Sequence, residues 1–367
     1  METKVWRHFD LVLLATTLIL LSYGLAMIYS ATLGIDTPGS FESRVVRQIL
    51  FIFMGIFLFF VMSALDYRVL WNLAYVAYGV IIALLMIVLI TGQVTHGSQR
   101  WIELGFFQLQ PSELGKLTLI MALSRYLADR TDQIEKTSFV LRTFLFPLPM
   151  VALVFAQPDV GTGSTYLAIW AGILVIAGLR VRHIASFVLA TLAIAPTSWF
   201  VMHDYMRERI LVFLDPSRDP LGQGYNVIQA LISVGAGGLT GRGFTSGTQS
   251  QLHFLRVKYA DFIFSVLAEE LGLVGAAILL GLFLVLLWRG LRVMSIAADP
   301  FGRLIATGVV SVLVYQVFVN VGMNSGLLPV TGITLPLISY GGSSTASMLM
   351  ALGVLESVAM RHRKFEF

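Results

Sequence analysis

Long apolar runs separated by shorter polar connections dominate the pattern of hydrophobic and polar positions in this chain. Most of the runs approach the roughly 20 residues that a helix needs to cross the hydrocarbon core of a bilayer. We therefore predict an all-α integral membrane protein in which residues 1–367 form a single polytopic domain. The ten transmembrane helices that the pattern predicts lie at 10–31, 48–65, 69–91, 111–128, 140–156, 162–178, 184–202, 262–288, 301–323 and 335–360.

The connection at about 203–261 is much longer than the others. A loop of this length is too long to serve only as a connector, and two pieces of it have a helical pattern. The piece from Tyr205 to Leu214 is amphipathic and suited to lie on the bilayer surface, and the second runs from Asn226 to Val234. The following run GAGGLTGRGF is rich in glycine, which favours either a flexible turn or a close approach of the backbone to a ligand.

The overall composition agrees with a membrane protein. Hydrophobic residues make up 57% of the chain and charged residues 13%, whereas soluble domains carry about 25% charged residues. The absence of cysteine excludes disulfides, thiolate metal sites and a cysteine nucleophile. The basic residues are scattered between the apolar runs rather than gathered in a stripe, which argues against a nucleic-acid partner.

Positive charge is distributed unevenly over the two sides of the predicted bundle. Most of the 25 lysines and arginines fall in segments on the side of the N-terminus. The positive-inside rule places that side in the cytoplasm. An even number of spans puts both termini there, so the loop at 203–261 is extracytoplasmic.

Asp261 lies between this loop and the apolar run that follows it. An aspartate at the boundary of a membrane span is expensive unless it is solvated, paired or used in function. One interpretation is a helix N-cap that accepts backbone N–H bonds. The other is a functional carboxylate, and the local pattern leaves both open.

Glu113 and Lys116 are three residues apart in the predicted span 111–128, so they share a helix face and can pair. Nine residues separate Lys116 from Arg125, which corresponds to roughly 14 Å along a helix. If Arg125 marks the inner interface, the pair lies deep in the membrane and faces the bundle interior or a water-filled cavity. A structural ion pair and a functional pair are equally compatible with this spacing.

Other charged residues are expected at the same outer level. Asp159 in QPDVGTG precedes a helix and suits capping or function, and Arg44 and Arg47 suit interfacial anchoring or a phosphate grip. The prolines and glycines of 327–344 predict a broken or re-entrant start of the last span. The six histidines are scattered, and we interpret them as ordinary surface or loop residues. The residues predicted to line an outward-facing cavity for an anionic, amphipathic substrate are Glu113, Asp159, Asp261, Arg44, Arg47 and Lys116.

Several stretches, in order along nearly the whole chain, resemble the SEDS family of cell-wall proteins, and their details are most similar to its elongation branch, the RodA proteins. The stretches are GSQRWIELGFFQLQPSELGK (97–116), AQPDVGTG (156–163), HDYMRERI (203–210), DPSRDPLGQGYNVIQ (215–229), GTQSQL (247–252), DFIFSVLAEELG (261–272) and PLISYGGSS (336–344). The resemblance implies ten spans in the bacterial plasma membrane and polymerisation of lipid II into β-1,4-linked glycan strands, with release of undecaprenyl pyrophosphate. It also implies a class B penicillin-binding protein and other elongation-complex proteins as partners.

The resemblance assigns roles to the candidate residues. It implies that Asp261 is the essential aspartate, which we expect to act as general base in one inverting displacement, and that Asp159 matches the aspartate of the QPD motif. Glu113 and Lys116 match its functional pair. We expect Arg44, Arg47 and Lys116, or a divalent cation such as Mg²⁺ or Mn²⁺, to offset the charge of the leaving pyrophosphate.

One stretch departs from the family pattern. Members usually read LPE-x-HTD at this place, whereas here the residues before Asp261 are Leu255-Arg256-Val257-Lys258-Tyr259-Ala260. Two alternatives therefore stay open beside the polymerase. A lipid II flippase would use Glu113, Lys116 and Asp159 for gating or ion coupling, and a scaffold would only position the transpeptidase.

Overall fold

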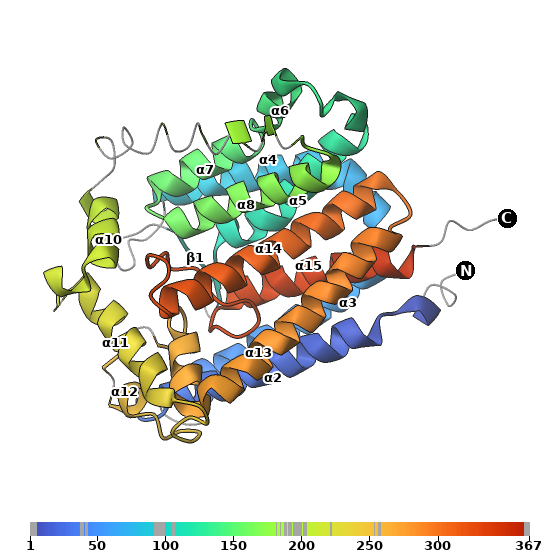
Figure 1. Cartoon of the computed structure of the whole chain (residues 1–367). Helices are drawn as coiled ribbons and strands as arrows, with labels where there is room; N and C mark the ends of the chain where they lie inside the picture. The colour runs from blue at the N-terminus through green and yellow to red at the C-terminus, as the bar shows by residue number, and fades with distance from the viewer. Residues whose placement is uncertain are drawn as a thin grey trace.

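The computed structural model describes residues 6–36, 40, 43–91, 100–104, 107–180, 182–183, 185–186, 189, 193, 200, 204–220, 222–252, 254–255 and 258–362. Its long helices lie side by side in one bundle (Figure 1). The two ends of the described chain meet at one end of the bundle, where the rings of His8 and His362 are 5.2 Å apart. The helices α10, α11 and α12 cover the opposite end.

Most of the predicted spans coincide with helices. The helices of the bundle are α2 (Leu11–Thr32), α3 (Arg44–Ala64), α4 (Tyr67–Thr91), α5 (Pro111–Ala128), α6 (Thr137–Thr143), α7 (Pro147–Ala156), α8 (Val160–Ala177), α13 (Ile263–Ile296), α14 (Pro300–Asn324) and α15 (Gly342–Met360), with short 3₁₀ turns η1 (Trp6–His8) and η2 (Thr131–Gln133). Seven are long and apolar enough to cross a membrane, and the pair α6–α7, bent by 42°, would make an eighth. The charged helix α5 is not among them. The predicted span 184–202 falls largely outside the described residues, so the count of ten stays a prediction.

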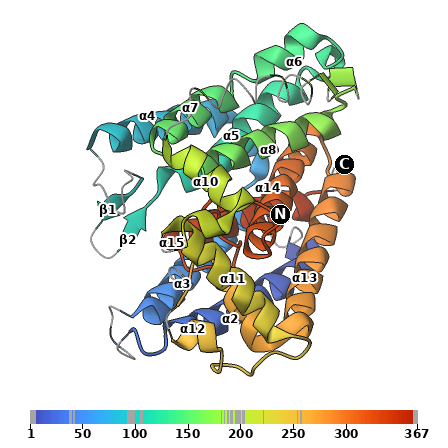
Figure 2. The same cartoon turned by 60° about the vertical axis from the view of Figure 1, so that its left-hand side comes forward.

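The long connection before α13 contains short helices. They are α10 (Asp204–Leu214), η3 (Pro216–Arg218), α11 (Gln223–Gly237) and α12 (Thr248–Gln251). A two-stranded antiparallel hairpin, β1 (Ile102–Leu104) and β2 (Phe107–Leu109), is an addition to the predicted all-α fold. Figure 2 shows the hairpin on one side of this end and α10 and α11 across its front.

Ser343, at the start of α15, links the hairpin to the bundle. Its hydroxyl donates to the carbonyl of Gln108 at 2.7 Å and accepts from the backbone N–H of Gln110 at 3.0 Å. The hairpin therefore leads directly into α5, whose first residue is Pro111.

A break at Gly272 divides α13, where φ is 63° and ψ is −162°. The glycine-rich loop GAGGLTGRGF packs against this break and satisfies its backbone groups. Arg242 N–H donates to the carbonyl of Glu269, and Leu273 N–H donates to the carbonyl of Gly238, both at 3.0 Å. Gly237 and Gly241 thus allow two backbone segments to meet, because a Cβ atom at either position would strike the backbone of α13. The helix also continues to Ile296, beyond the predicted end at 288.

The last span has the predicted broken start. Residues 325–341 are not helical, and Leu337 has a positive φ of 64°. Residues 335–339 of this segment are buried in protein, with Leu335 and Ile338 at most 1% exposed. Irregular backbone is tolerated at such depth only where protein or water surrounds it.

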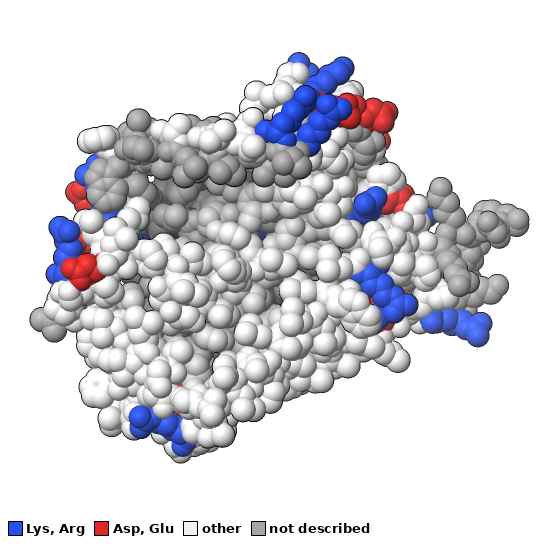
Figure 3. All heavy atoms as spheres, viewed as in Figure 1, with Lys and Arg blue, Asp and Glu red and all other residues white. Residues whose placement is uncertain are grey.

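Charged side chains gather at the two ends of the bundle, and the visible flank between them is almost free of them (Figure 3). Such an apolar belt is expected of a surface that faces lipid. One histidine departs from our interpretation: His183 is 3% exposed, and its Nε2 lies 3.1 Å from the hydroxyl of Thr137.

Two glycines of α11 provide a test of the packing at the break. A Cβ atom at Gly237 would lie 1.8 Å from the carbonyl oxygen of Ala268, whereas one at Gly235 would meet nothing within 4 Å. We expect Gly237→Ala to lower the free energy of unfolding by about 1–3 kcal/mol, as overpacking does. Gly235→Ala is the matched control and should be neutral or stabilising by up to about 1 kcal/mol. Thermal unfolding of both variants in detergent measures this, and equal stabilities would contradict the packing.

Candidate active site

Asp261 does not cap the helix that follows it. The N-cap position of α13 is Phe262, and no side chain makes a capping hydrogen bond there. The capping interpretation is therefore wrong. The carboxylate instead points into a region of buried and charged groups, with its Oδ2 atom 3.8 Å from the position of a Cβ built on Gly332.

The backbone that carries Asp261 is held by the irregular start of the last span. Tyr340 N–H donates to the carbonyl of Tyr259 at 2.9 Å. The Ser339 hydroxyl donates to the carbonyl of Ala260 at 2.7 Å. Both contacts involve only backbone atoms of the residues before Asp261, so they do not depend on the side chains that depart from the family pattern.

Two asparagines of α14 hold the next carbonyl. The Nδ2 atoms of Asn324 and Asn320 donate to the carbonyl oxygen of Asp261 at 3.0 and 3.2 Å. The Oδ1 atom of Asn324 accepts from Ser265 N–H and from its hydroxyl, at 3.2 and 2.6 Å. Sequence reasoning missed these asparagines, because nothing in the local pattern of an apolar helix shows which loop its amides will reach.

The surroundings of Asp261 change its proton affinity. Burial raises its pKa to about 6, and Arg209 opposes this rise; Asp159 adds to the rise and Arg100 opposes it. A carboxyl group with this pKa is mostly ionised at neutral pH but holds a proton more readily than an ordinary aspartate. The site thus unites two predicted acids with two arginines that we did not single out from the sequence.

Arg100 and Asp159 form one side of this group. Arg100 lies 3.6 Å from an oxygen of Asp159 and also donates to the carbonyl of Gln157 at 3.1 Å. Asp159 has its predicted capping role as well, because it accepts from the N–H and the hydroxyl of Thr162 at 3.1 and 2.8 Å. Gln110 reaches the same carboxylate at 3.4 Å.

Arg209 comes from the long loop, on α10. Its guanidinium donates to the carbonyl of Val330 at 3.0 Å. The segment 325–341 therefore contacts Arg209 on one side and the carbonyls before α13 on the other. The sequence shows Arg209 only as part of an amphipathic helix.

Glu113 and Lys116 form the predicted pair at the start of α5, with Nζ and Oε2 2.6 Å apart. Both are buried, at 7% and 5% exposure, so the pair faces the interior of the bundle. Ser347 of α15 donates to the same glutamate oxygen at 3.2 Å. The buried Tyr166 interacts electrostatically with both Glu113 and Asp159. It therefore lies near both the Glu113–Lys116 pair and the charged group around Asp261.

Arg44 and Arg47 lie beside the loop rather than at the Asp261 carboxylate. Arg44 forms an ion pair with Asp36, and its guanidinium is 4.4 Å from the centre of the Tyr259 ring. The charges of Arg47 and Arg44 both act on the hydroxyl of Tyr340, so both arginines are near this ring. The two tyrosine rings are 5.7 Å apart.

Two buried acids of α13, which we did not single out, position the GTQSQL stretch. Glu269 accepts from the N–H groups of Gln249 and Ser250 at 2.8 and 3.1 Å, and so caps α12. Glu270 accepts from the hydroxyl of Ser30 at 2.6 Å and from Thr245 N–H at 3.1 Å.

Lys258 completes this arrangement from the unusual stretch before Asp261. Its amine donates to the carbonyl of Ser250, and its side chain is 2% exposed. Burial lowers the pKa of Lys258 to about 8, while the charges of Glu270 and Glu269 oppose the fall. The loop that carries Asp261 is thus tied to GTQSQL as well as to the last span.

The arrangement offers carboxylates and cations, but not an all-protein metal cage. Within the ranges that the structure describes, no group of three or more His, Cys, Asp or Glu side chains could hold a metal ion. A divalent cation here would need ligands from a bound substrate.

Comparison with known proteins identifies the family. The family profile for FtsW, RodA and SpoVE, described as "Cell cycle protein", matches residues 10–364. The chain is 41% identical over 360 residues to "Peptidoglycan glycosyltransferase MrdB" of Escherichia coli K12, which covers 97% of this chain and 95% of that protein. It is 32% identical over 434 residues to "Peptidoglycan glycosyltransferase RodA" of Treponema pallidum, covering 98% and 100% of the two chains. The chain belongs to the SEDS family.

Solved structures of SEDS proteins have the same fold. One comes from a peptidoglycan synthase complex that coordinates polymerization and crosslinking, with a TM-score of 0.82, 35% identity and coverage of 96% of this chain and 98% of that one. The crystal structure of the rod shape determining protein RodA of Thermus thermophilus has a TM-score of 0.73, 30% identity and coverage of 97% and 98%. The elongation branch predicted from the motifs is thus represented among both sets of relatives.

The buried pair on α5 gives a test that separates packing from function. Lys116→Met leaves Glu113 buried without its cation, which should lower the free energy of unfolding by about 3–5 kcal/mol. The double variant Glu113→Gln/Lys116→Met removes both charges and should recover most of that loss. Thermal unfolding of wild type, both single variants and the double variant gives the coupling energy. A double variant as unstable as Lys116→Met would contradict the pairing.

Proposed function

We propose that this protein polymerises lipid II into β-1,4-linked glycan strands during cell elongation and releases undecaprenyl pyrophosphate. The enzyme class follows from the SEDS family and from relatives named peptidoglycan glycosyltransferase, MrdB and RodA: the chain is a glycosyltransferase. The observation that carries the finer proposal is the surroundings of Asp261. Its backbone is held at three successive carbonyls, and its carboxylate acts together with the charges of Arg209, Asp159 and Arg100.

Asp261 serves as the general base in this proposal. The acceptor 4-hydroxyl loses its proton to the Asp261 carboxylate while its oxygen attacks the anomeric carbon of the donor. The bond from that carbon to the pyrophosphate oxygen breaks, and the electron pair leaves with the lipid pyrophosphate. A pKa of about 6 suits this role, because the base is ionised at neutral pH and still accepts a proton effectively.

The positive charges of Arg209 and Arg100 both act on the Asp261 carboxylate. We therefore propose that these two arginines stabilise the negative charge of the leaving group. The sequence analysis assigned that role to Arg44 and Arg47, but these arginines lie beside Tyr259 and Tyr340. We propose that they bind the substrate beside the loop. Lys116 is engaged by Glu113 in the interior, so we propose that this pair sets the shape of the site.

A divalent cation, if the reaction uses one, is proposed to enter with the pyrophosphate. Asp159 and Asp261 are carboxylates, which suit Mg²⁺ or Mn²⁺, and substrate phosphates would supply the remaining ligands. The proton transfer and the stabilisation of the leaving group are proposed for Asp261, Arg100 and Arg209 without such a cation.

The proposed setting is the bacterial plasma membrane, with both termini cytoplasmic and Asp261 at the outer face. Support comes from the apolar belt and from the basic residues at the end that holds the termini. We propose a class B penicillin-binding protein as partner, together with other elongation-complex proteins. The likeness to a chain from a peptidoglycan synthase complex supports such a partner.

The direct test is polymerisation of purified lipid II by the protein and its partner, with transpeptidation blocked. Asp261→Ala should lose at least about a hundredfold in rate, the contribution expected of a general base. Asp204→Ala is the matched control, because this aspartate lies on α10 with its side chain 97% exposed. It should polymerise at the wild-type rate.

The other outcomes discriminate among the alternatives. Undiminished strands from Asp261→Ala would remove Asp261 from the chemistry. Absence of strands from all variants, with lipid II still bound, would favour a flippase or a scaffold; transfer of lipid II across vesicles then separates these two.

The pH dependence gives an independent measurement. Because the base works only when ionised and burial raises its pKa to about 6, the rate should rise with pH through about 6 and level off above it. At pH 5 about a tenth of the plateau rate should remain, since one unit below the pKa leaves about a tenth of the base ionised. Lipid II binding and thermal unfolding at each pH show that fold and affinity are retained. A profile centred near pH 4 would contradict the raised pKa.

A further inference from the structure

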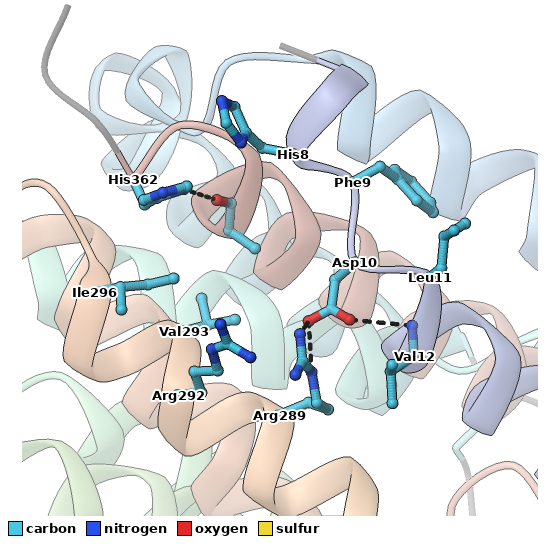
Figure 4. A pocket seen from close by; sticks show the side chains of 11 residues that line it. His8, Phe9, Asp10, Leu11, Val12, Arg289, Arg292, Val293, Ile296 and His362 are labelled. Atoms are coloured by element: carbon cyan, nitrogen blue, oxygen red, sulfur yellow. Dashed lines mark hydrogen bonds and ion pairs between the residues drawn. The ribbon is translucent and has the colours of Figure 1, made fainter.

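A cavity of about 560 Å³ lies at the end of the bundle that carries both ends of the described chain (Figure 4). Its walls come from three distant stretches: the segment leading into α2, the last turns of α13 and the end of α15. The cavity lies at the opposite end of α13 from Asp261. None of the catalytic residues proposed above lines it.

Asp10 lines this cavity, and its carboxylate already accepts as many hydrogen bonds as it can. One carboxylate oxygen accepts from Val12 N–H and Leu13 N–H, both at 3.1 Å, and the other accepts from Arg289, whose Nε is 2.7 Å away. The second bond from Arg289 comes from Nη2. A carboxylate offers about four acceptor sites, so these four bonds fill it. The backbone N–H of Asp10 is itself fixed by the buried Glu356, at 2.7 Å.

The walls of the cavity carry an excess of positive charge. Arg289 uses two of its guanidinium N–H groups on Asp10, and a guanidinium has five. Arg292, one turn further along α13, is exposed, and no carboxylate of the described part of the chain pairs with it. Figure 4 shows both arginines leaving the same side of α13 toward the Asp10 segment, with His8 and His362 above them. Since Asp10 is already saturated, the charge of Arg292 is available to an anion.

Exposed apolar side chains form part of the cavity lining, and we call this part its apolar mouth. Leu11 is 71% exposed and Ile296 38%, and both line the cavity. Further along α13, the exposed Leu284, Trp288 and Leu291 share one face, since they are four and three residues apart. Trp288 lies where the predicted span 262–288 ends, and an exposed tryptophan at such a position is typical of the bilayer interface.

We propose that this cavity binds an anionic phospholipid from the leaflet that contains the chain termini, which is the cytoplasmic leaflet in the orientation proposed above. The phosphodiester would lie against Arg292 and the outer N–H groups of Arg289, and an acyl chain would follow Leu291 and Trp288. Basic pockets between transmembrane helices at the cytoplasmic side are suited to anionic headgroups. The site is separate from Asp261 and does not depend on the polymerase activity.

The apolar mouth distinguishes a lipid from a free phosphate ion. An inorganic phosphate would use only the arginines and gain nothing from the exposed apolar side chains. A phospholipid would use both, because its chains bury apolar surface while its phosphate meets the guanidinium groups. A phospholipid therefore accounts for both the arginines and the exposed apolar side chains of the cavity, whereas a free phosphate ion accounts only for the arginines.

The test measures lipid binding to the full chain in a neutral detergent. Native mass spectrometry and thermal unfolding are followed while short-chain phosphatidylglycerol, phosphatidylcholine or inorganic phosphate is added. Wild type should bind and be stabilised by phosphatidylglycerol alone. Arg292→Gln should bind it about fivefold more weakly, because one arginine near the surface contributes about 1 kcal/mol to such binding. Arg303→Gln is the matched control: this arginine is exposed at the start of α14, at the same end of the bundle, and does not line the cavity.

Three outcomes overturn the proposal. Equal affinity for phosphatidylglycerol and phosphatidylcholine would show that charge is not recognised. Equal stabilisation by inorganic phosphate would show that the cavity is a site for the free ion. Equal weakening by Arg292→Gln and Arg303→Gln would assign the effect to net charge at this end rather than to the cavity.

Discussion

Three successive backbone carbonyls, those of Tyr259, Ala260 and Asp261, accept hydrogen bonds from α14 and from the irregular segment before α15. These bonds, together with the buried Leu255 and Phe262 on either side of this stretch, fix the backbone that carries the Asp261 carboxylate. They also explain how the loop can tolerate an unusual sequence, since carbonyl oxygens are common to all residues. The broken start of the last span contributes the Tyr340 N–H to this set, which a regular helix would use within its own backbone.

The same demand for partners shapes the interior. In an apolar bundle an unpaired charge is costly, and the buried charges of Glu113, Asp10, Glu269 and Glu270 all have specific partners. Glu113 pairs with Lys116 and Asp10 with Arg289, and the acids at the break of α13 receive backbone and hydroxyl donors from the long loop before this helix. The break itself follows this rule, because the glycine-rich loop supplies the groups that the interrupted helix lacks. Polar contacts therefore specify how the loop docks on an otherwise apolar scaffold.

The two ends of the bundle carry different chemistry. At the end with α10 and α11, acids and arginines gather around Asp261 and suit a phosphate-bearing substrate whose bonds change. At the end with the chain termini, Arg289 and Arg292 flank a cavity with an apolar mouth and suit a lipid that is held unchanged. Helix α13 connects the two, and its exposed apolar face lies between them.

Apolar runs in the sequence were sufficient to predict most of the long helices, and the prolines and glycines of 327–344 predicted the broken start of the last span. The spacing of three residues predicted the pair of Glu113 and Lys116, because helical periodicity is a local property. Tertiary structure alone decided that Asp261 does not cap its helix, that Arg209 acts on it from α10, and that His183 is buried. The physical reason is that periodicity tells which face of a helix is apolar, but not which distant segment meets that face. Contacts between residues far apart in the chain arise only when the whole bundle packs.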